Sequence, residues 1–133
     1  MVKTLLGLCL LVMSQLSWAG EFSALKYKTL EGETIKISDL KGKWVVINYW
    51  ATWCPPCLKE LPELVSFHDA RKDKDAFVIG INYEQIDQTT LKEFVESQMI
   101  DYPIVPEQPT RRGMTPFGPI RGLPTTVVLD PNG

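Results

Sequence analysis

The feature that most constrains this sequence is a pair of cysteines, Cys54 and Cys57, separated by two prolines. A nearly continuous apolar run, residues 44–49, precedes the pair, as expected of a parallel strand that is covered on both faces. After the pair, apolar residues recur at intervals of three and four between Leu61 and His68, which is the period of a helix. The two cysteines therefore lie where a strand passes into a helix.

The spacing of the two cysteines suits reversible disulfide chemistry. Residues three apart at a helix start have Cβ atoms about 5–6 Å apart, so a small adjustment brings them to disulfide geometry. Cys54, at the helix N-terminus, would meet unpaired N–H groups and the positive end of the helix dipole, which both favour a thiolate. Cys57 lies a turn deeper, and we expect it to be less exposed. The pattern predicts an attacking sulfur at Cys54 and a resolving sulfur at Cys57.

Several motifs around the cysteine pair resemble one known family. Residues 50–57 read Trp-Ala-Thr-Trp-Cys-Pro-Pro-Cys, and Leu-Lys-Glu-Leu-Pro follows. Lys-Gly-Lys at 41–43 and Gly-Leu-Pro-Thr-Thr at 122–126 complete the set. Together they resemble the TlpA/ResA-like thiol–disulfide oxidoreductases over roughly residues 22–133. This resemblance implies an α/β, thioredoxin-like fold and a role as an extracytoplasmic reductant of protein disulfides.

The resemblance also assigns roles to residues outside the pair. The family has an acid three residues after its second cysteine, where it assists proton transfer at the buried thiol, and Glu60 holds that position. A glutamate on a helix is otherwise usually solvated. The family sets a cis proline against its cysteines, and the backbone beside this proline pairs with an incoming peptide. Leu123 and Pro124 match this feature, and Trp53 and Pro55 complete the substrate-binding surface that we expect.

A metal site is an alternative role for the cysteines. Zinc needs about four ligands, and no second cysteine pair accompanies Cys54 and Cys57. The single histidine, His68, lies about 16 Å beyond Cys57 if the helix rises 1.5 Å per residue, which is out of reach. It falls on the apolar stripe, so we expect a partly buried structural histidine. Trp50 is expected to be a core residue, and no metal is expected.

The first residues, 1–19, have the pattern of a secretory signal peptide. A single lysine precedes an apolar run that includes Cys9, and a small-x-small cleavage pattern ends at Ala19. Cleavage there would leave residues 20–133 as the mature domain in an oxidising compartment, extracytoplasmic or periplasmic. An N-terminal membrane anchor is the alternative, although residues 4–18 are shorter than the roughly 20 that span a bilayer.

Length and composition are consistent with this assignment. A chain of 133 residues with 44% hydrophobic residues allows one domain with a real core. A net charge of −2 shows no basic excess, so nucleic acid is not an expected partner. The family resemblance implies a disulfide-containing substrate protein and a membrane electron donor as partners. Apocytochrome c is a frequent substrate class in the family. The dithiol itself needs no bound cofactor.

The order of elements expected along the chain is that of an α/β domain. Thr90 with Glu93 fits a capping box for the second helix, whose inner face would include Leu91 and either Gln98 or Met99. The expected elements are a hairpin of strands 22–30 and 34–38, a strand at 44–49, a helix at 55–71, a strand at 76–82, a helix at 89–99, a short extension at 102–105, a loop at 106–121 and a strand at 125–129.

The end of the sequence carries a separate expectation. The family continues past its counterpart of the strand at 125–129 with another strand and a helix. Neither follows here, so we expect a thioredoxin-like domain without its final strand and helix. The strand at 125–129 would then be an apolar edge, which is an aggregation hazard.

The sequence therefore predicts an exported thiol–disulfide oxidoreductase that acts as a reductase, and the family resemblance suggests cytochrome c maturation as its setting. A disulfide-forming oxidase is one alternative, distinguished by its reduction potential. A redox-inactive or metal-binding thioredoxin-like module is another, distinguished by metal content and thiol titration. A peroxidase is conceivable because the folds are related, but an isolated C-x-x-C is not its signature.

Overall fold

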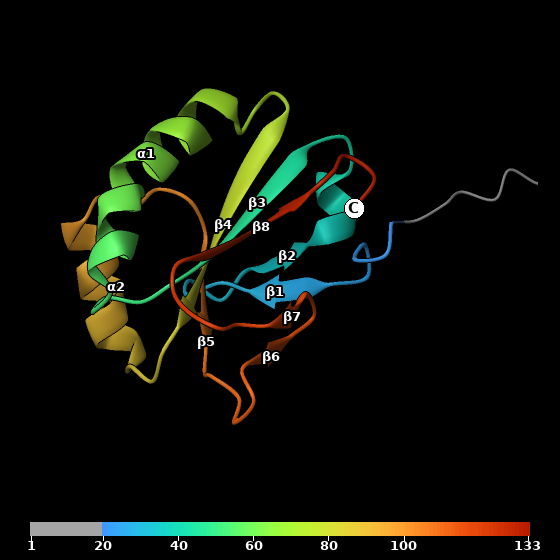
Figure 1. The fold of residues 1–133 in the computed structure, drawn as a ribbon. Helices are drawn as coiled ribbons and strands as arrows, with labels where there is room; N and C mark the ends of the chain where they lie inside the picture. The colour runs from blue at the N-terminus through green and yellow to red at the C-terminus, as the bar shows by residue number, and fades with distance from the viewer. Residues whose placement is uncertain (1–19) are drawn as a thin grey trace, which may run out of the picture.

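A four-stranded mixed sheet runs through the middle of the molecule (Figure 1). The computed structural model describes residues 20–133, so the signal-peptide prediction for residues 1–19 lies outside the described residues. The strand order is β5-β4-β3-β8, in which β3, β4 and β5 are mutually parallel and β8 is antiparallel to β3. The strands are β3 (Trp44–Trp50), β4 (Ala76–Tyr83), β5 (Ile104–Glu107) and β8 (Thr125–Leu129).

Two helices, α1 (Pro55–Arg71) and α2 (Gln88–Ser97), cover one face of this sheet (Figure 1). They share a face because the two crossovers, β3-α1-β4 and β4-α2-β5, step in the same direction and crossovers of this kind are right-handed. The helices and the sheet enclose a core that includes Trp50, Leu61 and Leu91, each at most 2% exposed.

The opposite face of the sheet is covered by short elements. A second core lies there around Ile47, Tyr49 and Ile81, all fully buried. These residues alternate along their strands with those of the helix-side core, as the period of two in a strand requires. The covering elements are β1 (Lys26–Lys28), β2 (Thr34–Lys36), the 3-10 helix η1 (Ile37–Leu40), β6 (Met114–Thr115) and β7 (Gly118–Pro119).

Glycine at position 80 of β4 is required by the close packing on the helix side. A Cβ atom built there would lie 2.8 Å from Ile104 Cδ1, 2.9 Å from Tyr102 Cε2 and 3.1 Å from Trp50 Nε1. Contacts under 3.0 Å force a neighbour to move. Gly80 therefore allows the side chain of Trp50, the last residue of β3, to pack closely against β4. Trp50 lies four residues before Cys54.

The predictions from periodicity are confirmed for α1, which has the predicted bounds, and for β8, while three others need correction. The first hairpin has shorter strands than predicted, and Ile37 begins η1 instead of extending a strand. The capping box is wrong, because the N-cap of α2 is Asp87, whose carboxylate accepts the Thr90 N–H at 2.9 Å. Neither Gln98 nor Met99 is on the inner face of α2, because both lie beyond the last helical residue and are exposed, Met99 by 81%.

The segment predicted as a loop at 106–121 is also partly ordered into strands. Its first two residues belong to β5, and residues 114–119 form the β6–β7 hairpin. The prolines do not prevent this, because strands of two residues leave few ladder hydrogen bonds for a proline to break.

Strand β8 forms one edge of the sheet among the described residues. It pairs with β3 from Thr125 opposite Tyr49 to Leu129 opposite Val45. Val128 is 54% exposed on the helix side of the sheet. In residues 20–133, neither helix is both long enough and apolar enough to cross a lipid bilayer.

Candidate active site

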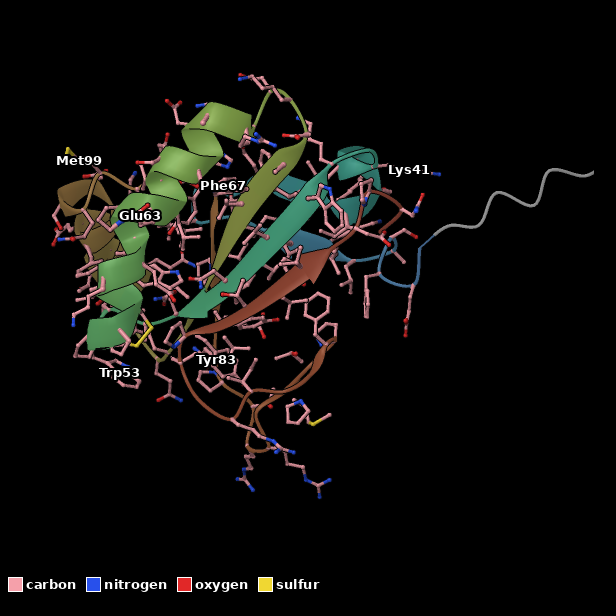
Figure 2. The ribbon with its side chains drawn as sticks, turned by 45° about the horizontal axis from the view of Figure 1, so that its top comes forward. Lys41, Trp53, Glu63, Phe67, Tyr83 and Met99 are labelled. Carbon is pink, nitrogen blue, oxygen red and sulfur yellow. A yellow bond between two sulfur atoms is a disulfide. The ribbon has the colours of Figure 1, made fainter. Side chains whose placement is uncertain are left out.

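Cys54 and Cys57 form a disulfide at the N-terminal end of α1, drawn in yellow beside Trp53 in Figure 2. Their Cα atoms are 5.2 Å apart, within the usual range for a disulfide. Strand β3 ends at Trp50 and helix α1 begins at Pro55, so the pair lies at the predicted strand-to-helix junction.

Cys54 is the N-cap residue of α1. Its backbone is extended, with φ −93° and ψ 103°, and its Sγ accepts a hydrogen bond from the Cys57 N–H at 3.4 Å. Pro55 and Pro56 occupy the first two helical positions and have no N–H to donate. The first turn therefore offers the Cys54 sulfur a single backbone donor.

The predicted difference in exposure between the two cysteines is not found. Cys54 is 2% exposed and Cys57 is 1% exposed. A disulfide holds its two Cβ atoms within about 4.5 Å, so both residues share one packing environment. In the disulfide form, capping position and not burial distinguishes Cys54 from Cys57.

Glu60 lies on α1 near a polar pair of residues on the sheet. Asn48, in the middle of β3, is 1% exposed and its Nδ2 lies 3.1 Å from Thr126 Oγ1 and 3.4 Å from Glu60 Oε2. Glu60 is half-buried. Asn48 was not predicted, although an amide within an apolar strand is the sequence signal that could have identified it.

The Leu123–Pro124 peptide bond is cis, which confirms the predicted conformation. Leu123 is partly buried and packs against the core cluster that contains both cysteines. Thr125, which follows Pro124, pairs with Tyr49 in β3. The cis bond therefore lies level with the end of β3, from which the chain continues to Cys54.

The two tryptophans beside the cysteines have different environments, as predicted. Trp50 is fully buried against Phe94, with ring centroids 5.9 Å apart. Trp53 is 67% exposed, and Pro55 is exposed next to it. Trp53, labelled in Figure 2, and Pro55 thus provide exposed apolar surface at the N-terminus of α1.

Glu84 is a site residue that the sequence did not reveal. It follows β4 directly, and its carboxylate accepts hydrogen bonds from the Thr52 N–H at 2.8 Å and the Thr52 hydroxyl at 3.1 Å. Asn82 Nδ2 also donates to Glu84, at 2.8 Å. This carboxylate joins the end of β4 to the turn that leads into Cys54.

His68 is a structural residue, and it is more deeply buried than predicted. It is 3% exposed, and its Nδ1 accepts the backbone N–H of Val78 at 3.1 Å. Its ring also packs edge-on against Phe77, with centroids 4.8 Å apart. Burial disfavours the imidazolium and lowers the pKa of His68 below its usual range, with a smaller opposing effect from Asp101.

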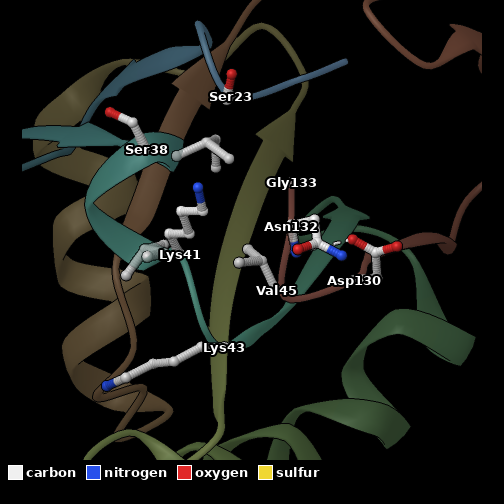
Figure 3. A pocket seen from close by; sticks show the side chains of 10 residues that line it. Ser23, Ser38, Lys41, Lys43, Val45, Asp130, Asn132 and Gly133 are labelled. Atoms are coloured by element: carbon white, nitrogen blue, oxygen red, sulfur yellow. Dashed lines mark hydrogen bonds between the residues drawn. The ribbon is translucent and has the colours of Figure 1, made fainter. Parts of the chain in front are cut away.

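Within residues 20–133, no three His, Cys, Asp or Glu side chains lie together in an arrangement that could hold a metal ion. A mostly apolar cavity of about 140 Å³ lies between η1, the start of β3 and the turn after β8. Figure 3 shows Val45 and Asn132 at this cavity. It is about 20 Å from the cysteine end of β3, given a rise of about 3.3 Å per residue.

Comparison with known proteins agrees with this geometry. The family model described as the AhpC/TSA family matches residues 19–133. The thiol-disulfide oxidoreductase ResA of Halalkalibacterium halodurans is 34% identical over 104 residues, which cover 78% of this chain and 57% of that protein. The chain thus spans less than two thirds of the length of this curated relative.

Solved structures show the same similarity in three dimensions. A secreted thiol-disulfide isomerase from Corynebacterium glutamicum matches with a TM-score of 0.71 and 30% identity, covering 82% of this chain and 69% of that one. StoA from Bacillus subtilis matches with a TM-score of 0.66 and 32% identity, covering 82% and 81%. The fold is therefore thioredoxin-like, and the chain belongs to the AhpC/TSA family, with thiol-disulfide oxidoreductases named ResA among its relatives.

Proposed function

We propose that this chain is an exported thiol–disulfide oxidoreductase that reduces disulfides in other proteins. The observation that carries the proposal is the Cys54–Cys57 disulfide at the N-terminus of α1, where Cys54 caps the helix beside an exposed apolar rim. The names of the relatives, ResA and StoA among them, support the same chemistry. The export part of the proposal rests on the signal-peptide pattern of residues 1–19.

In the proposed mechanism the reduced pair gives two electrons to the substrate. The Cys54 thiolate attacks one sulfur of the substrate disulfide, whose S–S bond breaks, and the other substrate sulfur leaves as a thiolate. Cys57 then loses its proton, with help from Glu60, and attacks the Cys54 sulfur of the mixed disulfide. The second substrate thiolate leaves, and Cys54–Cys57 is oxidised. A separate dithiol donor, which we take to be a membrane protein, reduces the pair again.

The substrate would bind across the rim and the cis-proline segment. Trp53 and Pro55 offer exposed apolar surface next to Cys54. The backbone at Leu123 and Pro124 would pair with an extended segment of the substrate, in the manner of an added strand. Apocytochrome c is the substrate class suggested by the resemblance to the family.

A single measurement tests the direction of electron transfer, that is, whether the cysteine pair reduces or oxidises its substrate. Because Pro55 and Pro56 leave the Cys54 thiolate one backbone donor, the reduced form gains little stabilisation, which favours a reductant. We expect a reduction potential nearer that of thioredoxin, about −270 mV, than that of DsbA, about −120 mV. The potential is measured by equilibrating the pair in dithiothreitol or glutathione buffers. A value above about −180 mV, the level of protein disulfide isomerase, contradicts the reductase and favours the oxidase.

A further inference from the structure

The turn of residues 51–54, which connects β3 to α1, is short, and its Trp53 side chain is exposed. Cys54 N–H donates to the Ala51 carbonyl at 3.3 Å, which closes a turn with Thr52 and Trp53 at its corners. The backbone N–H of Thr52 has no partner within this turn. Trp53 is 67% exposed and cannot anchor the turn by packing. Ala51 and Cys54, at the ends of the turn, are buried in the core, so the corner at Thr52 is the part that needs a further anchor.

Glu84 supplies that anchor. Its Oε1 accepts from the Thr52 N–H at 2.8 Å and its Oε2 accepts from the Thr52 hydroxyl at 3.1 Å, so both carboxylate oxygens bind one residue. Asn82, which is fully buried opposite Trp50 in the sheet, donates to the same Oε1 at 2.8 Å. A buried strand end thus fixes Glu84, and Glu84 fixes Thr52, two residues before Cys54.

We propose that Glu84 is a positioning residue for the attacking sulfur, holding the 51–54 turn so that Cys54 keeps its place as the cap of α1. The proposal rests on the proposed function in one respect, that Cys54 is the attacking cysteine. Glu84 does not touch the sulfur in this role. It acts through Thr52 and the turn. At the capping position, Cys54 receives the hydrogen bond from the Cys57 N–H and lies at the positive end of the helix dipole.

The negative charge of Glu84 and the capping position that Glu84 maintains have opposite effects on the pKa of the Cys54 thiol. This opposition makes the proposal testable. A nearby carboxylate disfavours a thiolate, so removal of the Glu84 charge alone would lower the pKa of Cys54. Loss of the capping position would raise that pKa, because the thiolate would lose its donor and the helix terminus. Glu60, another acid on α1, accepts a hydrogen bond from Asn48, and the variants below leave it in place.

The experiment measures the pH dependence of Cys54 alkylation by iodoacetamide. It uses the full chain with Cys57→Ser, which keeps the backbone N–H at position 57. Mass spectrometry of tryptic peptide 44–59 quantifies modification of Cys54 separately from Cys9. Glu84→Ala removes the anchor. Glu84→Gln removes the charge but can still accept from the Thr52 N–H and donate to its hydroxyl. Glu63→Ala, on an exposed position of α1, is the matched control.

The proposal requires that Glu84→Ala move the alkylation midpoint to higher pH and slow the reaction at pH 7 about three- to tenfold. In Glu84→Gln, the alkylation rate at pH 7 should stay within about twofold of the parent rate, and the midpoint should be unchanged or slightly lower in pH. Glu63→Ala should match the parent in both the rate and the midpoint. A midpoint in Glu84→Ala that is unchanged or lower overturns the proposal, because a purely structural or purely electrostatic role gives that result.

A milder variant keeps the test valid if Glu84→Ala does not fold. Thr52→Val removes the hydroxyl bond to Oε2 and leaves the backbone bond, so it should shift the midpoint in the same direction by a smaller amount. A Thr52→Val protein with the parent midpoint contradicts the proposal. Alkylation needs neither a disulfide substrate nor an electron donor, so its outcome is separate from the reduction potential that tests the proposed function.

Discussion

The backbone N–H of Cys57 is the one donor that the first turn of α1 extends to the sulfur of Cys54, at 3.4 Å. A cap side chain normally accepts from the second or third helical N–H. Here the second helical residue is Pro56, which has none. The number of donors at this sulfur can therefore be changed by one substitution.

Pro56→Ala should make the pair more oxidising. The new N–H at the second helical position would stabilise the Cys54 thiolate and hence the reduced form. A hydrogen bond to a charged group contributes about 1.5–3 kcal/mol, and 1.4 kcal/mol corresponds to about 30 mV, so we expect a rise of about 30 mV or more. Pro55→Ala is the control, because an N–H at the first helical position is not a usual donor to the cap. Equal shifts in both variants would refute the capping argument.

The two cysteines should differ sharply in trapping experiments despite their equal burial. Cys57→Ser should accumulate a mixed disulfide with a disulfide-containing protein through Cys54, because nothing resolves it. Cys54→Ser should accumulate at least tenfold less, since Cys57 has no place at the helix cap. Non-reducing gels with peptide mapping measure both, and mapping excludes adducts at Cys9. Comparable trapping by the two variants would contradict the assignment of Cys54 as the attacking sulfur.

Glu60→Gln should slow turnover about tenfold to a hundredfold without abolishing it, as expected for loss of a proton-transfer group. The amide keeps the size of the side chain but cannot take the Cys57 proton. The pH dependence of Cys57 alkylation, measured in the Cys54→Ser chain, should move with the substitution. Glu63→Gln, exposed on the same helix, serves as the control. An unchanged pH profile would make Glu60 an ordinary half-buried side chain.

Acid should destabilise the fold through His68. Burial lowers its pKa in the folded state, whereas the unfolded chain has a value near 6.5. The unfolded state therefore binds more protons below about pH 6.5, and the free energy of unfolding falls as the pH drops from there towards the folded pKa. His68 is the only histidine in the chain.

His68→Gln separates this effect from that of the carboxylates. The variant should lose about 1–3 kcal/mol at pH 8 from the Val78 hydrogen bond. Its stability should then change less than that of the parent between pH 7 and pH 5. Urea unfolding at several pH values measures both quantities. Parallel pH curves for the two proteins would show that His68 is not the acid-sensitive group.

The exposed edge formed by β8 should cause self-association of residues 20–133. Val128 is 54% exposed beside backbone groups that have no strand partner in the described part of the chain. Val128→Lys should reduce association, measured by sedimentation over a range of concentrations. Met99→Lys adds the same charge at an 81% exposed site beyond α2 and should not reduce it. A chain of residues 20–133 that is monomeric and unfolds reversibly at all concentrations would disprove this prediction.

The sequence predicted those features that depend on neighbours in the chain. Periodicity located β3, α1, β4 and β8, and the motif located the disulfide and the cis proline. Glu84 and Asn48 were missed because their partners are distant: Thr52 is 32 residues from Glu84, and Thr126 is 78 residues from Asn48. No local pattern marks such a pair before the strands are aligned.

The error at the start of α2 has a different origin. Asp87 and Thr90 are both favourable N-cap residues, so the local sequence permits either start. The structure uses Asp87, and Thr90 becomes a donor to it. A similar ambiguity applies at Ile37, where an apolar residue at strand spacing is buried at the start of a 3-10 helix.

The pairing of β3 with β8 has a consequence for engineering and for evolution. The segment before Cys54 and the segment after Pro124 are adjacent strands in fixed register, and Asn48 and Thr126 link them by a hydrogen bond. The chain between β5 and residue 121 can therefore change length without moving the two halves of the site apart. Insertions or deletions within residues 108–121 would therefore alter this outer segment while leaving the Cys54–Cys57 pair and the cis proline in register.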